Sequence, residues 1–239
     1  LWQRRVLHGK LARIMIDKEV LVFSAGRTGS TFIWQCLCKI FTKVHKHHDG
    51  QASHLFQKKL PCIITERNRV ESFVSKMRVI RAKDESNQDF LDSLSDSLHA
   101  LLDNGVLQKD VDDYYLELHT VEYLKAAYSG KLLTLKYEDF FNNYDFIFDQ
   151  FEKFFEISIA TSIKDSIAHD TNLSANQNRQ RKFENFNSHC KDSLIHGKHI
   201  LSGEPNFYKN YIDPEMYNRL HNMLWEKNED WKKLYNYEG

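Results

Sequence analysis

The stretch VLVFSAGRTGSTFIWQ, running from Val20 to Gln35, decides the fold of this chain. Its first four residues, Val20 to Phe23, form a short apolar run that predicts a buried parallel strand. After several small residues, an apolar-periodic segment from Phe32 to Phe41 predicts a helix. The stretch therefore reads strand, tight turn and helix.

The turn itself is rich in groups that bind anions. Gly26 and Gly29 let the backbone approach a ligand closely, and the first N–H groups of the following helix have no intrahelical partners. Arg27 adds a fixed positive charge. Hydroxyl donors stand beside it at Thr28, Ser30 and Thr31. Glycines alone would also suit a plain connection, but together with these polar residues they predict an anion site.

A phosphate-binding loop of the kinase type is one interpretation of this turn. That motif is G-x-x-x-x-G-K-[S/T], in which the lysine reaches the β- and γ-phosphates. Here Ser30 follows Gly29, and the only cation in the turn, Arg27, precedes it. A P-loop kinase or NTPase therefore stays as the alternative hypothesis.

Composition limits the remaining possibilities. The 239 residues suit one domain, and a formal net charge of zero with 28% charged residues argues against a nucleic-acid partner. No apolar run approaches the length of a membrane span, and we see no signal peptide. The four cysteines form no disulfide or metal pattern, which favours a reducing, cytoplasmic location.

The rest of the chain predicts an α/β domain. Apolar and alternating runs predict strands at 42–49, 60–65 and 131–137. Apolar stripes predict helices from Val70 onward, in two pieces between 86 and 128 with a turn at Asn104-Gly105, at 140–155, and from Pro214 to about 227. The polar stretch 165–198 is expected to be a mobile loop.

The run GRTGSTF, residues 26–32, resembles the phosphosulfate loop of sulfotransferases that use 3'-phosphoadenosine 5'-phosphosulfate (PAPS). The resemblance implies a single domain over residues 1–239, with a P-loop NTPase-like fold in which helices flank a mostly parallel central sheet. It also implies PAPS as cosubstrate, no metal, and a loop that binds the cosubstrate. The loop residues would be Arg27, Thr28, Gly29, Ser30 and Thr31.

Histidines near the second predicted strand supply candidates for a general base, because imidazole titrates near neutral pH. A cluster of histidines could also hold a metal or simply be solvated. Family members carry Lys-x-His at the end of this strand, and Lys43-Val44-His45 resembles that pattern. We expect Lys43 to assist and His45 to act as base, with His47 second. Lys46-His47-His48 offers the same pattern in another register.

The resemblance extends to the nucleotide site. Arg67 follows the third predicted strand and Ser75 comes eight residues later, the spacing with which the family holds the 3'-phosphate. The family's proline is replaced by Arg69. Tyr137 opens a Tyr-Glu-Asp run typical of the family and would lie against the adenine, on which Phe32 would stack.

The implied activity is transfer of a sulfuryl group to a hydroxyl, or as a second choice to an amine. The acceptor would be a small molecule or a glycan, and the helical insertion at about 86–128 would help to shape its pocket. Weaker family features, Gly203 and Tyr208-Lys209-Asn210, come before the last predicted helix. Besides the kinase hypothesis, a non-catalytic nucleotide-binding protein remains as a third possibility.

Overall fold

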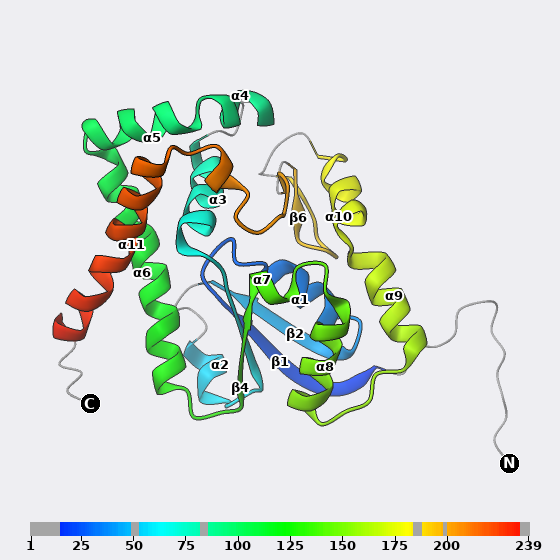
Figure 1. Ribbon diagram of the computed structural model, residues 1–239. Helices are drawn as coiled ribbons and strands as arrows, with labels where there is room; N and C mark the ends of the chain where they lie inside the picture. The colour runs from blue at the N-terminus through cyan, green and yellow to red at the C-terminus, as the bar shows by residue number, and fades with distance from the viewer. Residues whose placement is uncertain (1–14, 49–52, 82–85, 184–187, 198–199, 235–239) are drawn as a thin grey trace, which may run out of the picture.

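A four-stranded parallel sheet lies at the centre of the computed structural model, which describes residues 15–48, 53–81, 86–183, 188–197 and 200–234 (Figure 1). The strands are β1 (Ile16–Phe23), β2 (Phe41–His47), β3 (Cys62–Glu66) and β4 (Leu132–Lys136). They are ordered β2-β1-β3-β4, and every neighbouring pair is parallel. The predicted α/β class with a parallel sheet is confirmed.

Helices connect the strands and cover both faces of the sheet (Figure 1). Their bounds are α1 (Ser30–Leu37), α2 (Ser53–Gln57), α3 (Arg69–Arg81), α4 (Asn87–Asp92), α5 (Leu94–Asp103), α6 (Val106–Ala127), α7 (Tyr137–Phe140), α8 (Tyr144–Phe155), α9 (Thr161–Thr171), α10 (Leu173–Gln180) and α11 (Pro214–Leu234), with a 3-10 turn η2 (Tyr208–Asn210). The helices predicted between 86 and 128 are present, with the first stripe divided at Ser93.

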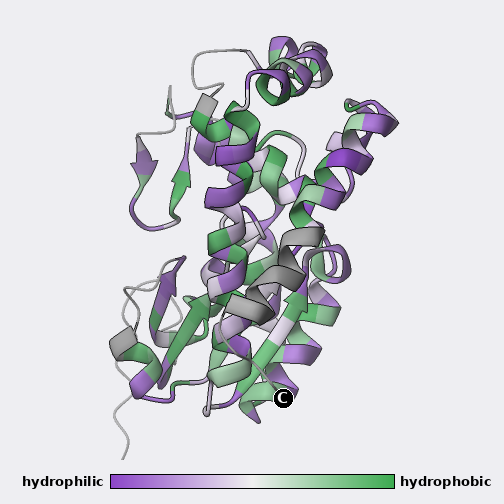
Figure 2. Cartoon of the chain, turned by 90° about the vertical axis from the view of Figure 1, so that its left-hand side faces the viewer, coloured by the Kyte–Doolittle hydropathy of each residue, from purple (hydrophilic) through white to green (hydrophobic). Residues whose placement is uncertain are grey.

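Alternation along the strands divides the core into two clusters. Leu21 and Ile64 face a cluster that includes residues of α3, α5, α6 and α11. Val22 and Ile63 face the other side, toward α1, α8 and α9. Figure 2 shows the central strands as mostly hydrophobic, as expected when a sheet is covered on both faces.

The expectation of a loop over 165–198 is wrong for most of that stretch. It contains most of α9, all of α10 and a short antiparallel hairpin, β5 (His189–Cys190) with β6 (Ile195–His196). Asn172 caps α10 by accepting from the Ala175 N–H, and the buried Asn176 donates to Gln35 Oε1. Polar residues that looked solvated therefore make caps and buried contacts. Residues 184–187 and 198 of the stretch lie outside the described residues.

Candidate functional site

A cavity of about 570 Å³ opens at the carboxyl ends of the strands. Its wall includes the loop after β1, the end of β2, the turn before α3 together with the second half of that helix, α7 and residues 200–208. Ligands of open α/β sheets bind at this edge, because the connections there diverge and leave a crevice. The predicted anion loop lies directly in it.

The loop before α1 has the backbone that its sequence predicts. Gly29 has φ 86° and a Cβ there would lie 2.6 Å from Tyr137 Cδ2, so only glycine fits. Arg27 is also left-handed, with φ 69°. Ser30 and Thr31 both line the cavity. The loop thus leads the first turn of α1 to the cavity wall, as an anion site requires.

Thr28 has a different place from the one expected. Its hydroxyl is buried, donates to the Ala25 carbonyl at 2.9 Å and shares a hydrogen bond of 2.7 Å with Thr65 Oγ1. Thr65 Oγ1 in turn lies 2.9 Å from Ser24 Oγ. This chain of hydroxyls ties the loop to β3, so the Thr28 side chain stabilises the loop instead of facing a ligand.

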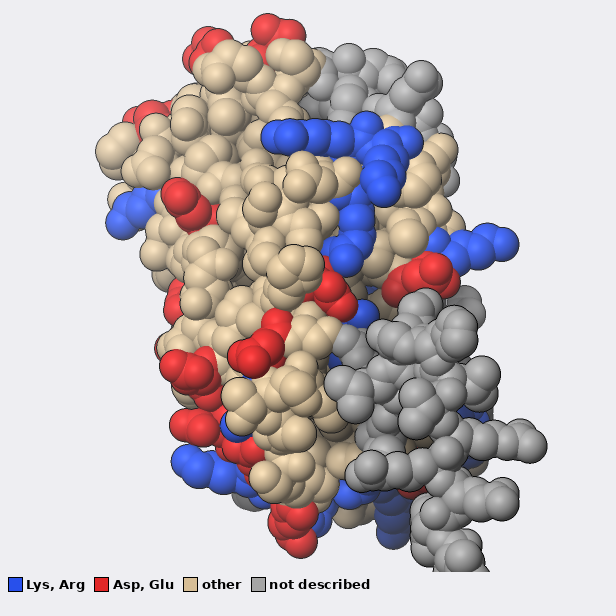
Figure 3. Space-filling model, turned by 90° about the vertical axis from the view of Figure 1, so that its right-hand side faces the viewer, with Lys and Arg blue, Asp and Glu red and all other residues tan. Residues whose placement is uncertain are grey.

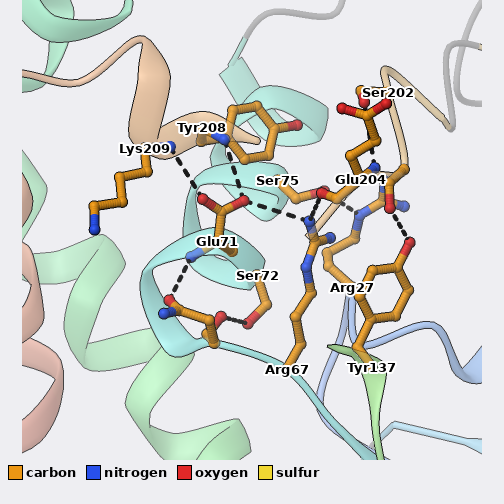
Figure 4. A network of polar contacts seen from close by, with 12 residues as sticks. Arg27, Arg67, Glu71, Ser72, Ser75, Tyr137, Ser202, Glu204, Tyr208 and Lys209 are labelled. Carbon is orange, nitrogen blue, oxygen red and sulfur yellow. Dashed lines mark hydrogen bonds and ion pairs between the residues drawn. The ribbon is translucent and has the colours of Figure 1, made fainter. Parts of the chain in front are cut away.

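Arg27, Arg67 and Ser75 meet at one wall of the cavity, as their sequence spacing predicts (Figure 4). Arg27 Nε donates to the buried Ser75 Oγ at 3.0 Å. Burial lowers the pKa of Arg27 to about 10, so its charge persists at neutral pH. The Arg67 guanidinium lies 4.5 Å from the centre of the Tyr137 ring. Its Nε is buried and has no hydrogen-bond partner among the described residues.

The turn that carries Arg67 forms without the family's proline. Arg69 begins α3, a position where proline is also tolerated, and its Nη1 donates to the Leu224 carbonyl at 3.2 Å. The Asn68 N–H donates to Glu138 Oε1 at 3.0 Å, and Asn68 Oδ1 accepts from the Glu71 N–H at 3.2 Å. Side-chain caps therefore fix a turn that a proline ring fixes elsewhere.

Lys46 and His48 occupy the place expected for a lysine and a base. Both line the cavity, and Lys46 Nζ lies 2.6 Å from His48 Nε2. His48 Nδ1 lies 2.8 Å from the Ser24 carbonyl. A carbonyl only accepts, so Nδ1 carries the proton and Nε2 of the neutral ring keeps a lone pair. Burial lowers the pKa of His48 to about 4 and that of Lys46 to about 8, with Lys46 and Arg27 respectively adding to the effect.

The first-choice base, His45, does not fit this geometry. Its Nε2 lies 2.6 Å from Glu19 Oε1, and Lys43 Nζ lies 2.8 Å from the same oxygen. Hydrogen bonds from Lys43 and His45 lower the pKa of Glu19 to about 2. His45 pairs with Leu21 inside the sheet, and neither it, Lys43 nor His47 lines the cavity. The physical reason is alternation along β2: Lys43, His45 and His47 share one face of the strand, whereas Lys46 and His48 follow the opposite parity and line the cavity.

An aromatic wall closes another side of the cavity. Phe32 stacks on Phe140 with ring centres 6.0 Å apart and contacts Tyr144 edge-on at 5.7 Å. Phe32, Tyr137 and Phe140 all line the cavity. The Tyr137 hydroxyl donates to the Gly203 carbonyl, and burial raises its pKa to about 12. These rings offer flat apolar surface of the kind on which a nucleobase stacks.

Three charged residues of the site were missed by sequence reasoning. Glu117 Oε2 accepts from the Gly26 N–H at 3.2 Å, and Glu117 Oε1 lies 2.5 Å from Lys76 Nζ. Glu71 is buried beside Arg67. Glu117 follows Gly26 by 91 residues, so no local pattern connects them. For Glu71, its place between Arg67 and Ser75 was the available signal.

Comparison with known proteins now gives the family. The family model described as "Sulfotransferase domain" matches residues 38–232. The chain belongs to the sulfotransferase domain family. The matched range begins after residues 26–32, so the resemblance of that loop to a phosphosulfate loop and the family match are separate observations. No curated protein matches in a sequence comparison.

A solved sulfotransferase has a similar structure. It is mouse sulfotransferase SULT7A1, described as complexed with PAP, 16% identical to this chain with a TM-score of 0.59. The match covers 91% of this chain and 86% of the mouse chain. At that identity the likeness shows the sulfotransferase fold alone. Among the helices that the structure describes, none combines the length and apolar character of a bilayer span.

Figure 3 shows side chains of both signs on one face of this sulfotransferase, with several Lys and Arg gathered in its upper half and Asp and Glu spread over the rest. Within the cavity, by contrast, Arg27, Lys46 and Arg67 converge. Their concentration in a partly buried space favours a small polyanion there over an extended one.

Proposed function

We propose that this protein transfers a sulfuryl group from PAPS to an acceptor hydroxyl, with His48 as the general base. The observation that carries the proposal is the presence in one cavity of the anion loop, the Lys46–His48 pair and the Arg67–Ser75 pair. Arg67 Nε, which has no hydrogen-bond partner within the described part of the chain, and the glycine-only position at Gly29 support a phosphate-bearing ligand.

Each residue then has a defined task. His48 Nε2 takes the proton of the acceptor hydroxyl while that oxygen forms a bond to sulfur. The bond from sulfur to the 5'-phosphate oxygen breaks, and the charge left on that oxygen is stabilised by Arg27 and the N–H groups that open α1. Lys46 assists at the sulfuryl oxygens, which replaces the expected role of Lys43.

The nucleotide would lie along the remaining walls. Arg67 and Ser75 hold the 3'-phosphate, while Phe32 and Tyr137 flank the adenine. Apolar side chains such as Val79 and Ile195 line the same cavity. They favour an acceptor with an apolar body, such as a phenol or aliphatic alcohol, over a glycan.

The first test compares ligands of the free protein. The desulfo product, 3',5'-adenosine bisphosphate (PAP), should raise the melting temperature more than ATP with magnesium does, because a ligand that binds only the folded state stabilises it. The opposite order would favour a P-loop kinase or NTPase. PAP binding without turnover on any acceptor would favour a non-catalytic nucleotide-binding protein.

A second test addresses the 3'-phosphate. Arg67→Ala should weaken PAP roughly 10- to 100-fold, as expected for a lost charge-assisted contact, and leave adenosine 5'-phosphosulfate nearly unaffected. Calorimetric titration measures both ligands. Equal losses for the two would remove Arg67 from the 3' site.

A further inference from the structure

The first turn of α3 carries a carboxylate that contacts two distant parts of the site (Figure 4). Glu71 is fully buried, and its Oε2 lies 3.4 Å from Arg67 Nη2. Its oxygens also accept from the backbone N–H groups of Tyr208, at 3.2 Å, and Lys209, at 3.0 Å. One side chain therefore joins the β3–α3 turn to residues more than a hundred positions later.

The two N–H groups are the first donors of η2. The opening N–H groups of a helical turn have no partner within it and need an acceptor from elsewhere. Glu71 supplies that acceptor, so a carboxylate of α3 caps η2. Burial raises the pKa of Glu71, while the Tyr208 and Lys209 N–H groups and Arg67 favour its ionised form.

Residues 200–210, here called the 200–210 segment, form one wall of the cavity with side chains that include Leu201 and Phe207. Besides Glu71, two more contacts fasten this segment. The Tyr137 hydroxyl donates to the Gly203 carbonyl, and Arg67 Nη2 donates to the Glu204 carbonyl at 3.3 Å. The groups that hold the segment are thus the ones that surround the proposed nucleotide.

The hydrogen bonds that fix the Arg67 guanidinium are made by its Nη2 atom. Nη2 lies between Glu71 Oε2 and the Glu204 carbonyl, and the flat face lies on Tyr137. Nε has no hydrogen-bond partner among the described residues. A buried N–H without an acceptor is costly, and a phosphate oxygen would satisfy it. By fixing Nη2, Glu71 and the Glu204 carbonyl therefore orient the Nε–H group of Arg67 so that it can donate to an anion.

We propose that Glu71 is the positioning residue of the 3'-phosphate site: it orients Arg67 and, through Tyr208 and Lys209, holds the 200–210 segment against the nucleotide. This inference rests on the proposed function, because it assigns the 3'-phosphate to Arg67. Glu71 itself does not touch the ligand. Its carboxylate fixes the group that does.

The test is a double-mutant cycle read with two ligands. Glu71→Gln is nearly isosteric, keeps one acceptor oxygen and removes the charge. It should weaken PAP roughly 10- to 100-fold and change the affinity for AMP, which lacks the 3'-phosphate, far less. When Arg67 is already alanine, Glu71→Gln should weaken PAP little further, because both substitutions remove the same contact between Arg67 and the 3'-phosphate. Calorimetric titration gives the four affinities, and circular dichroism verifies folding.

Glu204→Ala is the matched control, because it removes a nearby exposed carboxylate whose residue meets Arg67 only through its backbone carbonyl. Its PAP affinity should equal that of the wild type. If Glu71→Gln does not fold, Glu71→Asp keeps the charge one methylene back and should still weaken PAP more than AMP.

Two outcomes overturn the inference. One is an equal loss of PAP and AMP affinity, and the other is an undiminished effect in the Arg67→Ala background; each would make Glu71 a purely structural residue. A wild-type protein that fails to bind PAP would instead overturn the proposed function. A wild type that binds PAP, beside a Glu71→Gln variant that binds it equally well, removes only the role of Glu71.

Discussion

At the residue scale, the orientation of His48 decides what its ring can do. The Ser24 carbonyl fixes the proton on Nδ1, so Nε2 is the atom left with a lone pair in the cavity wall. Lys46 occupies that lone pair in the free protein. An acceptor hydroxyl can therefore donate its proton to Nε2 only when the Lys46 ammonium turns away from the ring. The negatively charged oxygens of a sulfuryl group are a suitable new partner for Lys46.

His48→Ala should lower kcat about 100- to 10,000-fold, the usual contribution of a general base, while PAP affinity stays near that of the wild type. His45→Ala is the control, because His45 contacts Glu19 and not the cavity. Sulfuryl transfer to a phenol and PAP titration measure the two effects. A loss of turnover in His45→Ala alone would return the base assignment to His45.

When PAP binds at pH values just above 8, the protein should take up a proton at Lys46. Burial lowers the pKa of Lys46 from 10.5 to about 8, so above that pH the free protein holds a neutral amine. A bound polyanion favours the ammonium form and raises the pKa again, hence protons enter on binding. Below that window Lys46 is already charged and uptake should vanish.

Calorimetry in two buffers of different ionisation enthalpy measures this proton uptake. Lys46→Met should abolish it at every pH. Uptake that persists in Lys46→Met would assign the proton to another group.

At the element scale, two helices of this protein begin after a left-handed glycine. Gly29 precedes α1 with φ 86°, and Gly105 precedes α6 with φ 74°. Only the first is enclosed: a Cβ on Gly29 would meet Tyr137 and Phe140, whereas nothing lies within 4 Å of one on Gly105. The loop before α1 is therefore fixed by packing as well as by backbone conformation.

Substituting Gly29 and Gly105 in turn separates the cost of backbone conformation from the cost of overpacking. Gly105→Ala should lower the free energy of unfolding by about 1 kcal/mol, the cost of a left-handed alanine. Gly29→Ala should lower it by about 2 to 5 kcal/mol, since overpacking adds to that cost, and should weaken PAP. Urea denaturation measures both. Equal losses would mean that the aromatic residues beside Gly29 move aside without cost.

At the scale of the whole molecule, the sheet separates two apolar clusters. Ile147 of α8 is fully buried in one, and Ile212 is 5% exposed in the other. The cavity lies at the edge of the sheet where the two halves meet, and it includes neither isoleucine.

Ile147→Val and Ile212→Val should each lower the free energy of unfolding by about 0.5 to 1.5 kcal/mol. Because the two sites share no partner, the double variant should lose the sum to within about 0.5 kcal/mol, with PAP affinity retained. Urea denaturation of the four proteins gives the cycle. A coupling larger than that would show that the two clusters are not independent.

Much of the site could be predicted because its parts are local. The strand, turn and helix around Gly29 follow from apolar runs and glycines, and Arg67 stands in the turn just before the helix that carries Ser75. The register of β2 was not predictable in the same way. Two Lys-x-His runs follow one another there, and only the folded structure shows that Lys46 and His48, not Lys43 and His45, line the cavity.

The sequence by itself determined the parallel α/β fold, the glycine-containing loop before α1 and the spacing that brings Arg67 and Ser75 to one cavity, since these depend on patterns within a few turns of the chain. Only the tertiary structure decided that Thr28 faces inward and that Glu71 and Glu117 belong to the site. It also turned the polar stretch after 165 into helices and a hairpin. The physical reason is that a polar side chain finds its hydrogen-bond partner in space, and that partner can be a hundred residues away.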